Sequence, residues 1–205
     1  SQHTQTTLAI PQESSGKLDY SGFSIARYQT DEWSTLAPLV HDSDICLFPS
    51  GIAAAFPELG ESKAYLVVDG YDPLLAEWLA LYDKQDADHL HRDWRHLMTH
   101  LHDQFQMGDF FICASERQRD WWLGLLEAHG RINPATYQAA PSLRNLVDVV
   151  AYGLPDTKPN HTRQVVKGIW DGIEHHDHLL LWGGGLWAWL DPVTAIHAVG
   201  RIWQQ

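Results

Sequence analysis

The chain has 205 residues, of which 44% are hydrophobic and 20% are charged, a composition typical of a globular protein with a buried core. Against 26 acidic residues it has 14 basic ones, so a formal net charge of -12 argues against binding to nucleic acid or to an anionic membrane. Two cysteines argue against a disulfide scaffold. Since we find neither an export signal nor an apolar run of ~20 residues, we expect a cytoplasmic protein without an integral membrane segment.

Short apolar runs alternate with longer helical patterns along the chain. The runs expected to form strands are 23–28, 44–48, 64–68, 110–114, 146–151 and 179–182. The helical patterns cover 31–41, 73–84, 88–106, 115–129 and 192–203. Asp44, Asp72, Ser115 and Asp191 are expected to cap helices. Repeated strand-helix units predict an α/β fold, a Rossmann-like open parallel sheet flanked by helices.

Composition also predicts how the chain is divided. Residues 1–22 are polar and lack periodicity, which indicates a flexible lead-in or an edge segment. Two prolines between Pro155 and His161 indicate a linker, and therefore a domain boundary.

Carboxylates follow the expected strand 64–68. In open parallel sheets ligands bind beyond the carboxyl ends of the strands, and a carboxylate there can orient an acceptor hydroxyl or take its proton. Asp72 precedes Pro73 and also suits a helix cap, whereas Asp69 has no equally simple structural role. Asp69 is therefore the stronger candidate for chemistry.

A glycine-rich turn, Gly183 to Gly185, precedes the last helical pattern. Glycines at such a turn let backbone N–H groups approach a phosphate or a sugar closely. The turn lacks the lysine of a P-loop, so a tight strand-to-helix connection packed under the tryptophans is the simpler alternative. Trp187 and Trp189 cannot both be buried in the same way, and one of them is expected to face a ligand.

Histidines gather in the pattern 88–106. His96 and His100 are four residues apart, a spacing that chelates a metal when a third ligand such as Asp93 joins them. No His-Glu-x-x-His pattern is present, so a solvated helix flank is the favoured interpretation and no metal site is predicted.

Four blocks of sequence, taken in order, resemble bacterial retaining glycosyltransferases of family 4. The blocks are 69–73 (DGYDP), 109–119 (DFFICASERQR), 149–155 (VVAYGLP) and 181–192 (LWGGGLWAWLDP), and the likeness extends over roughly 44–205. The last block is the most specific.

The resemblance implies a GT-B fold, in which two Rossmann-like domains face one another. Residues 23–155 would then form much of the acceptor-side domain, 156–177 an interdomain linker and helix, and 178–205 the incomplete start of the donor-binding domain. The resemblance implies a metal-independent enzyme that transfers a sugar, with retention, from a nucleotide-sugar donor to a hydroxyl of a carbohydrate or lipid-linked acceptor. It needs no cofactor, because the nucleotide-sugar is a co-substrate.

The resemblance also implies roles for individual residues. Gly183, Gly184, Gly185 and Trp187 would bind the donor, and Asp191 would cap the helix. Asp69 and Asp72 would be catalytic. The acceptor side would be lined by Tyr71, Ser115, Glu116 and Gly153.

Parts of the family pattern are missing from these residues. No basic residue lies between Lys167 and Arg201 to neutralise a diphosphate, and no pair of glutamates eight residues apart follows Glu174. We therefore expect a fragment or a truncated relative that is inactive by itself. The alternatives are a non-catalytic α/β binding or interaction module and, less favoured, a His-rich metal-binding protein.

Overall fold

The computed structural model describes residues 4–14, 22–81, 87–154, 156–187 and 190–203. The strands are β1 (Thr7–Pro11), β2 (Ser24–Tyr28), β3 (Ile45–Pro49), β4 (Tyr65–Asp69), β5 (Phe110–Cys113) and β6 (Val147–Val149). The helices are α1 (Trp33–His41), α2 (Ile52–Ala55), the 3-10 helix η1 (Pro57–Glu61), α3 (Leu74–Leu81), α4 (Ala87–Met107), α5 (Glu116–Ala128), α6 (Pro134–Ala139) and α7 (Pro192–Trp203). The chain forms two compact units, Ser1–Leu74 with Lys84–Ala151, and Leu75–Asp83 with Tyr152–Gln205.

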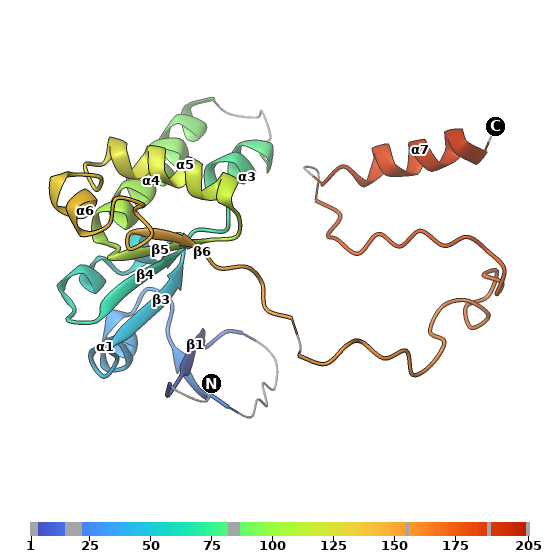
Figure 1. Ribbon diagram of the computed structural model, residues 1–205, viewed down its shortest axis with the longest axis horizontal. Helices are drawn as coiled ribbons and strands as arrows, with labels where there is room; N and C mark the ends of the chain where they lie inside the picture. Colours follow the sequence, from blue (N-terminus) through green and yellow to red (C-terminus); the bar gives the residue numbers. More distant parts are fainter. Residues whose placement is uncertain (1–3, 15–21, 82–86, 155, 188–189, 204–205) are drawn as a thin grey trace. The chain divides into compact units, whose positions relative to one another are not determined.

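The first unit is built around a four-stranded parallel sheet with the strand order β3-β4-β5-β6 (Figure 1). A helix follows each of the first three strands, as the repeated strand-helix pattern predicts. The α/β class and the parallel sheet flanked by helices are thereby confirmed. The five runs from 23 to 151 all form strands; β2, β5 and β6 are shorter than their runs, and β3 and β4 have the expected length but begin and end one residue later.

One face of this sheet is packed and the opposite face is open. Phe48, Val68, Phe111 and Val147 occupy one row across the four strands, and all four side chains are buried in the core. Side chains alternate between faces along a strand, so the neighbouring residues point the other way. On that opposite face Ile45 is 62% exposed and Tyr65 is 68% exposed.

Helices α4 and α5 supply much of the packed core. Phe105 of α4 and Trp122 of α5 are buried against Phe111, with ring centroids 5.0 Å apart for the first pair and 5.8 Å between Trp122 and Phe111. Helix α5 begins as predicted at Ser115, whose hydroxyl accepts a hydrogen bond from the N–H of Gln118 at 3.3 Å. Both cysteines are free thiols, which confirms the expectation that they form no disulfide.

Strands β1 and β2 form a separate parallel pair in the same unit. Strand β1, Thr7–Pro11, lies within the residues expected to be a lead-in or an edge segment. The ring of Tyr28, at the end of β2, packs edge-on against Phe56 at 5.9 Å. The pair therefore shares the core of the four-stranded sheet.

Two expectations about local structure are wrong. Residues 179–182 form no strand, and Leu180 and Leu181 are exposed. An isolated strand has no stability without a hydrogen-bonded neighbour, and the second unit contains no strand among its described residues. Asp44 caps no helix but precedes β3, where its carbonyl accepts a hydrogen bond from the N–H of Tyr65. The expected helix end at Lys84 and the boundary at Pro155 lie outside the described residues.

Candidate functional site

The carboxyl ends of the four parallel strands carry one row of side chains on the open face of the sheet. The register joins Pro49 to Asp69, Asp69 to Ile112, and Ile112 to Asp148. Adjacent strands are about 4.8 Å apart, so the two aspartates lie roughly 10 Å from one another, on either side of Ile112. Two carboxylates thus share the edge at which open parallel sheets bind ligands.

Asp69 is the last residue of β4 and its side chain is half-buried. Its carboxylate makes no hydrogen bond or ion pair to any residue that the structure describes. An acceptor with no partner of its own, at a sheet edge, is available to a ligand hydroxyl. Sequence analysis placed Asp69 in this position, and the sheet register confirms the placement.

The loop after Asp69 is fixed by α5. The indole Nε1 of Trp122 donates to the carbonyl oxygen of Gly70 at 2.9 Å, and both groups are buried. A Cβ on residue 70 would lie 2.2 Å from the Trp122 ring, so only glycine fits here. The N–H of Gly70 donates to the carbonyl of Ile112 at 2.8 Å, which extends the pairing of β4 with β5.

Gln118 joins the same loop to the end of β5. Its Nε2 donates to the carbonyl oxygen of Tyr71 at 2.9 Å, and its Oε1 accepts from the N–H of Ala114 at 2.7 Å. Both halves of the amide are used, so the loop and the start of α5 are held in one arrangement. Tyr71 is exposed beside this contact, where a ligand can reach its ring.

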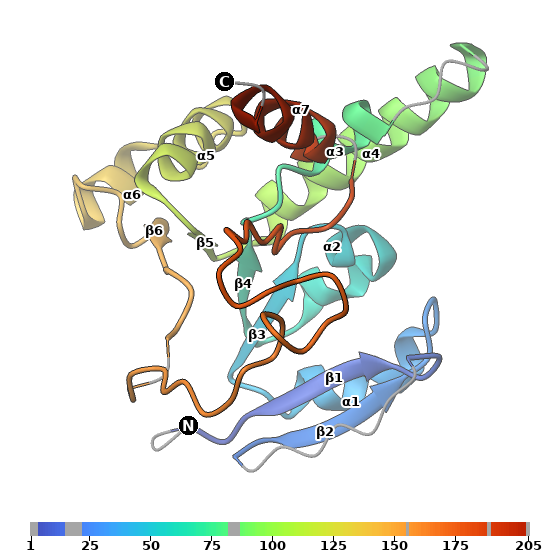
Figure 2. The same ribbon diagram turned by 90° about the vertical axis from the view of Figure 1, so that its right-hand side faces the viewer.

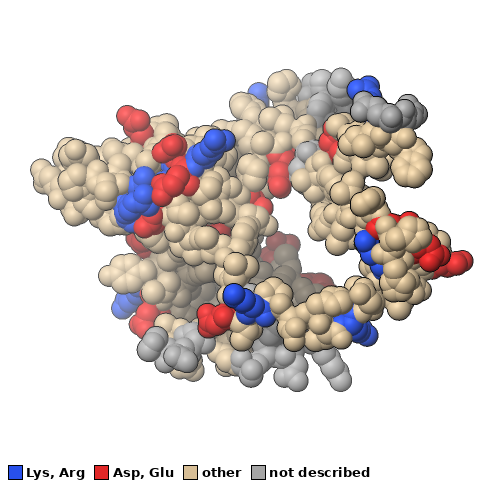
Figure 3. Space-filling view, turned by 45° about the vertical axis from the view of Figure 1, so that its right-hand side comes forward, with Lys and Arg blue, Asp and Glu red and all other residues tan. Residues whose placement is uncertain are grey.

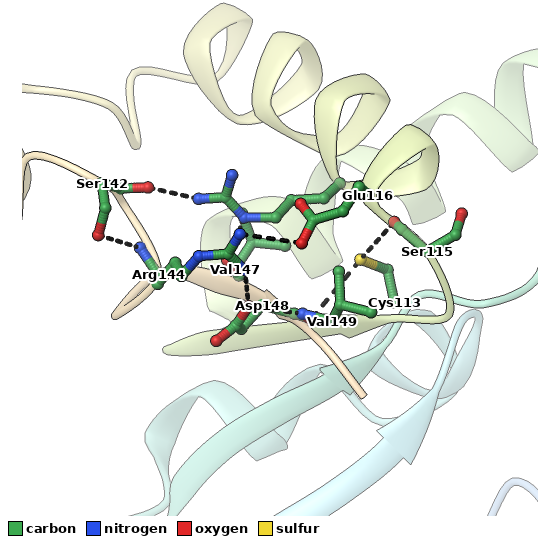
Figure 4. Close-up of polar contacts among 9 residues, drawn as sticks. Cys113, Ser115, Glu116, Ser142, Arg144, Val147, Asp148 and Val149 are labelled. Atoms are coloured by element: carbon green, nitrogen blue, oxygen red, sulfur yellow. Dashed lines mark hydrogen bonds and ion pairs between the residues drawn. The ribbon is translucent and has the colours of Figure 1, made fainter. Parts of the chain in front are cut away.

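A charged group lies at the β6 end of the row (Figure 4). Arg144 forms ion pairs with Asp148, four residues later, and with Glu116 at 2.9 Å. The N–H of Val149 donates to the Asp148 carboxylate at 2.8 Å, and this bond together with Arg144 lowers the pKa of Asp148. The expected acceptor-side residue Glu116 is therefore ion-paired with an arginine that it shares with Asp148.

Arg119 and Cys113 connect β5, β6 and α5 next to that group, and Figure 4 shows the contacts of Cys113 with Ser115 and Asp148. The buried Arg119 donates through Nε to the carbonyl of Val147 at 2.9 Å and through Nη2 to the carbonyl of Ser142. The thiol of Cys113 lies 3.6 Å from the carbonyl oxygens of Ser115 and Asp148. Burial raises the pKa of this thiol, so it stays protonated and serves packing.

The predicted donor-binding residues belong to the second unit. The indole Nε1 of Trp182 donates to the carbonyl of Gly185 at 3.0 Å, while a Cβ on Gly183 would meet no atom within 4 Å. The backbone at Gly183 is therefore open, whereas a Cβ on Gly185 would lie 2.5 Å from the Trp187 ring, so this ring covers Gly185. Trp187 itself is 57% exposed. Gly153, which the resemblance assigns to the acceptor side, is also open and belongs to this second unit.

Asp191 caps α7, as expected. Its carboxylate accepts a hydrogen bond from the N–H of Thr194 at 3.1 Å. Hydrogen bonds from the side chain and the backbone of Thr194 lower the pKa of Asp191. The side chain of Asp191 thus serves as the N-terminal cap of α7.

The histidine-rich helix offers no complete metal site. The rings of His96 and His100 have centroids 4.0 Å apart, and burial together with the neighbouring His96 lowers the pKa of His100. Within the part of the chain that the structure describes, no three His, Cys, Asp or Glu side chains are grouped in a way that holds a metal ion. The expected third ligand, Asp93, is not brought to the pair.

The surface shows no concentration of positive charge on the face drawn in Figure 3, where Lys and Arg side chains stand singly or beside acidic ones. None of the described helices has both the length and the apolar character needed to cross a bilayer. Comparisons with protein-family models, with curated proteins and with solved structures find no match to this chain.

Sequence analysis missed four residues that shape this edge, namely Trp122, Gln118, Arg144 and Asp148. Asp148 lies inside an expected strand, and its position there was a usable signal, because a charged residue in an otherwise apolar run marks an open face. The contacts of Gln118 and Trp122 join residues 47 and 52 positions apart, so no local pattern reveals them.

Proposed function

We propose that this chain carries much of the acceptor-side domain of a retaining glycosyltransferase of GT-B architecture, followed by the start of its donor-binding domain. The observation that carries the proposal is the carboxylate of Asp69 at the carboxyl end of β4, which has no partner among the described residues and lies next to a loop fixed by Trp122 and Gln118. A catalytic group needs a rigid support of this kind, because misplacement by about 1 Å costs much of the rate.

In this proposal Asp69 orients the acceptor hydroxyl and takes its proton. As that oxygen bonds to the anomeric carbon of the sugar, the bond from the anomeric carbon to the diphosphate oxygen breaks and the nucleoside diphosphate leaves. Asp72 lies three residues later in the same segment and has no partner among the described residues, so it suits a second contact to the acceptor. Tyr71, exposed between them, provides a ring on which a sugar can stack.

The glycines of the second unit support a donor role. The open backbone at Gly183 and the exposed ring of Trp187 suit contact with a nucleotide-sugar. No basic residue lies between Lys167 and Arg201, so neutralisation of the diphosphate must come from elsewhere. This is why we propose the start of a donor-binding domain rather than a complete one.

The test is sugar transfer by the protein expressed from its complete reading frame. UDP-, GDP- and ADP-sugars are offered with a panel of glycan and lipid-linked acceptors, and nucleoside diphosphate release is measured with and without a chelator. We expect release that requires an acceptor, resists the chelator and yields a product with the anomeric configuration of the donor. Acceptor binding without release would favour the non-catalytic binding module, and loss of release on chelation would contradict the metal-independent mechanism.

A further inference from the structure

Among the described strands, β1, β2, β3 and β6 each have one open edge. Strand β3 pairs with β4 alone and β1 pairs with β2 alone among the described strands. The two sheets belong to one compact unit and share one core, to which β1 contributes Ala9 and β2 contributes Tyr28. In Figure 2, β1 is drawn between β2 and β3. Of these open edges, those of β1 and β3 belong to the strand of each sheet that is drawn nearer the other sheet.

The residue composition of β1 and β3 is typical of strands from the middle of a sheet. The sequences TLAIP of β1 and ICLFP of β3 contain no charged residue. Edge strands are normally protected by lysine, inward-pointing charges or bulges, whereas strands inside a parallel sheet are continuously apolar. Leu47, near the middle of β3, is 60% exposed.

Backbone groups on both edges point away from the existing partner. The N–H of Tyr65 donates to the carbonyl of Asp44, so by the alternation of a parallel ladder Ile45 and Leu47 direct their N–H and C=O groups away from β4. The N–H of Ser24 donates to the carbonyl of Thr6, which by the same rule leaves Thr7 and Ala9 directed away from β2. Two rows of backbone N–H and C=O groups, one on β3 and one on β1, therefore have no strand partner among the described residues.

The strand order matches that of a doubly wound sheet from which one strand is missing. After β2 the chain crosses to β3 and then moves outward through β4, β5 and β6, and all pairings are parallel. A doubly wound sheet has the order 3-2-1-4-5-6, in which the first strand lies at the centre. The order β2-β1, a vacancy, then β3-β4-β5-β6 reproduces that arrangement with the central strand absent.

We propose that the open edges of β1 and β3 together receive one further parallel β-strand, an uncharged apolar segment about five residues long that comes from outside the described residues. Its length follows from β1 and β3, which have 5 residues each. Inserted there, the strand joins the two sheets into one and satisfies the edge groups of Leu47 and Ala9. The carboxyl end of the inserted strand then lies beside Pro49, at the same edge as Asp69.

The test uses backbone hydrogen exchange of β3, followed by mass spectrometry. The probe is a synthetic peptide with a Val-Ile-Val-Leu-Val centre between lysine pairs, and the control peptide has proline at the central position. We expect the probe to slow exchange at Ile45 and Leu47 at least ~10-fold and saturably, while the proline peptide does not. No slowing, or equal slowing by both peptides, would overturn the proposal. Slow exchange in the chain by itself would also overturn it, because the edge would then already be covered by the chain or by a second copy.

Variants separate edge pairing from nonspecific binding. Leu47→Pro removes a donor directed at the vacancy and should abolish the protection. Ile45→Lys, which introduces a charge at the same edge without a backbone constraint, should weaken it at least ~10-fold and serves if the proline variant does not fold. Tyr137→Lys on α6 replaces an equally exposed apolar residue away from both edges and should leave protection unchanged. Protection that survives Ile45→Lys would contradict the proposed site.

Discussion

The indole N–H of Trp122 donates a hydrogen bond to the carbonyl oxygen of Gly70 at 2.9 Å, and the same ring occupies the space that a side chain on residue 70 would need. Trp122 lies one strand-helix unit later than Gly70, so this contact ties the loop after β4 to the helix after β5. The position of Asp69 depends on it.

Replacing Gly70 by alanine should destabilise the first unit. The added Cβ would lie 2.2 Å from the Trp122 ring, and the resulting overpacking should lower the free energy of unfolding by about 1–3 kcal/mol. Gly124→Ala in α5 is the matched control, because a Cβ there meets no atom within 4 Å and should stabilise the helix by about 0.5–1 kcal/mol. Urea unfolding of the two variants should therefore show opposite signs, and a neutral Gly70→Ala would contradict the close contact.

Arg119→Met should loosen β6 from α5. The variant removes one donor from the buried carbonyl of Val147 and another from the part-buried carbonyl of Ser142, so the free energy of unfolding should fall by about 3 kcal/mol. Arg117→Met, an exposed arginine of the same helix, should change it by less than about 0.5 kcal/mol. Equal unfolding midpoints for the two variants would show that Arg119 does not hold the strand.

Most elements of the first unit follow from local patterns, and the exceptions have physical causes. Apolar runs predict β2 to β6 because a strand covered by helices keeps its apolar side chains together. Helix α6 escapes notice because it is short, although Asn133 before Pro134 is a capping signal, and the structure shows its side chain accepting bonds from two N–H groups. Residues 179–182 look like a strand, but a strand needs a partner that the sequence pattern does not specify.

The residues of the candidate site also divide into those that local sequence patterns predict and those that only the tertiary fold brings together. Asp69 is predictable because parallel strands present their carboxyl ends at one edge. Its partner in the row, Asp148, is placed by the register of three strands, and Gln118 by a contact across the fold. These relationships arise from tertiary pairing. The charge of Asp148 in an apolar run indicates an open face of the sheet, but the sequence does not indicate which residues lie beside it.

Low pH should weaken the contacts that the Asp148 carboxylate makes with Arg144 and Val149 at the β6 end of the row. Hydrogen bonding from Val149 and the ion pair with Arg144 lower the pKa of Asp148 from its ordinary value of 3.8. The unfolded chain therefore binds this proton more readily, so the stabilisation is present above that ordinary value and is lost as the pH falls through the lowered one. Arg144→Met should raise the pKa of Asp148 toward its ordinary value, because it removes the hydrogen bond and the charge of Arg144 and leaves the Val149 bond in place. A carboxyl NMR titration measures both values, and a wild-type midpoint at or above 3.8 would contradict the network.

The central claim, that Asp69 acts on the acceptor hydroxyl, is tested most directly by Asp69→Asn in the protein expressed from its complete reading frame. Removal of a carboxylate that accepts the acceptor proton should lower the turnover number for acceptor-dependent nucleoside diphosphate release at least ~100-fold, with unfolding unchanged in urea. Asp42→Asn, an exposed aspartate at the end of α1, should retain wild-type turnover. Near-normal turnover of a folded Asp69→Asn protein would contradict the account.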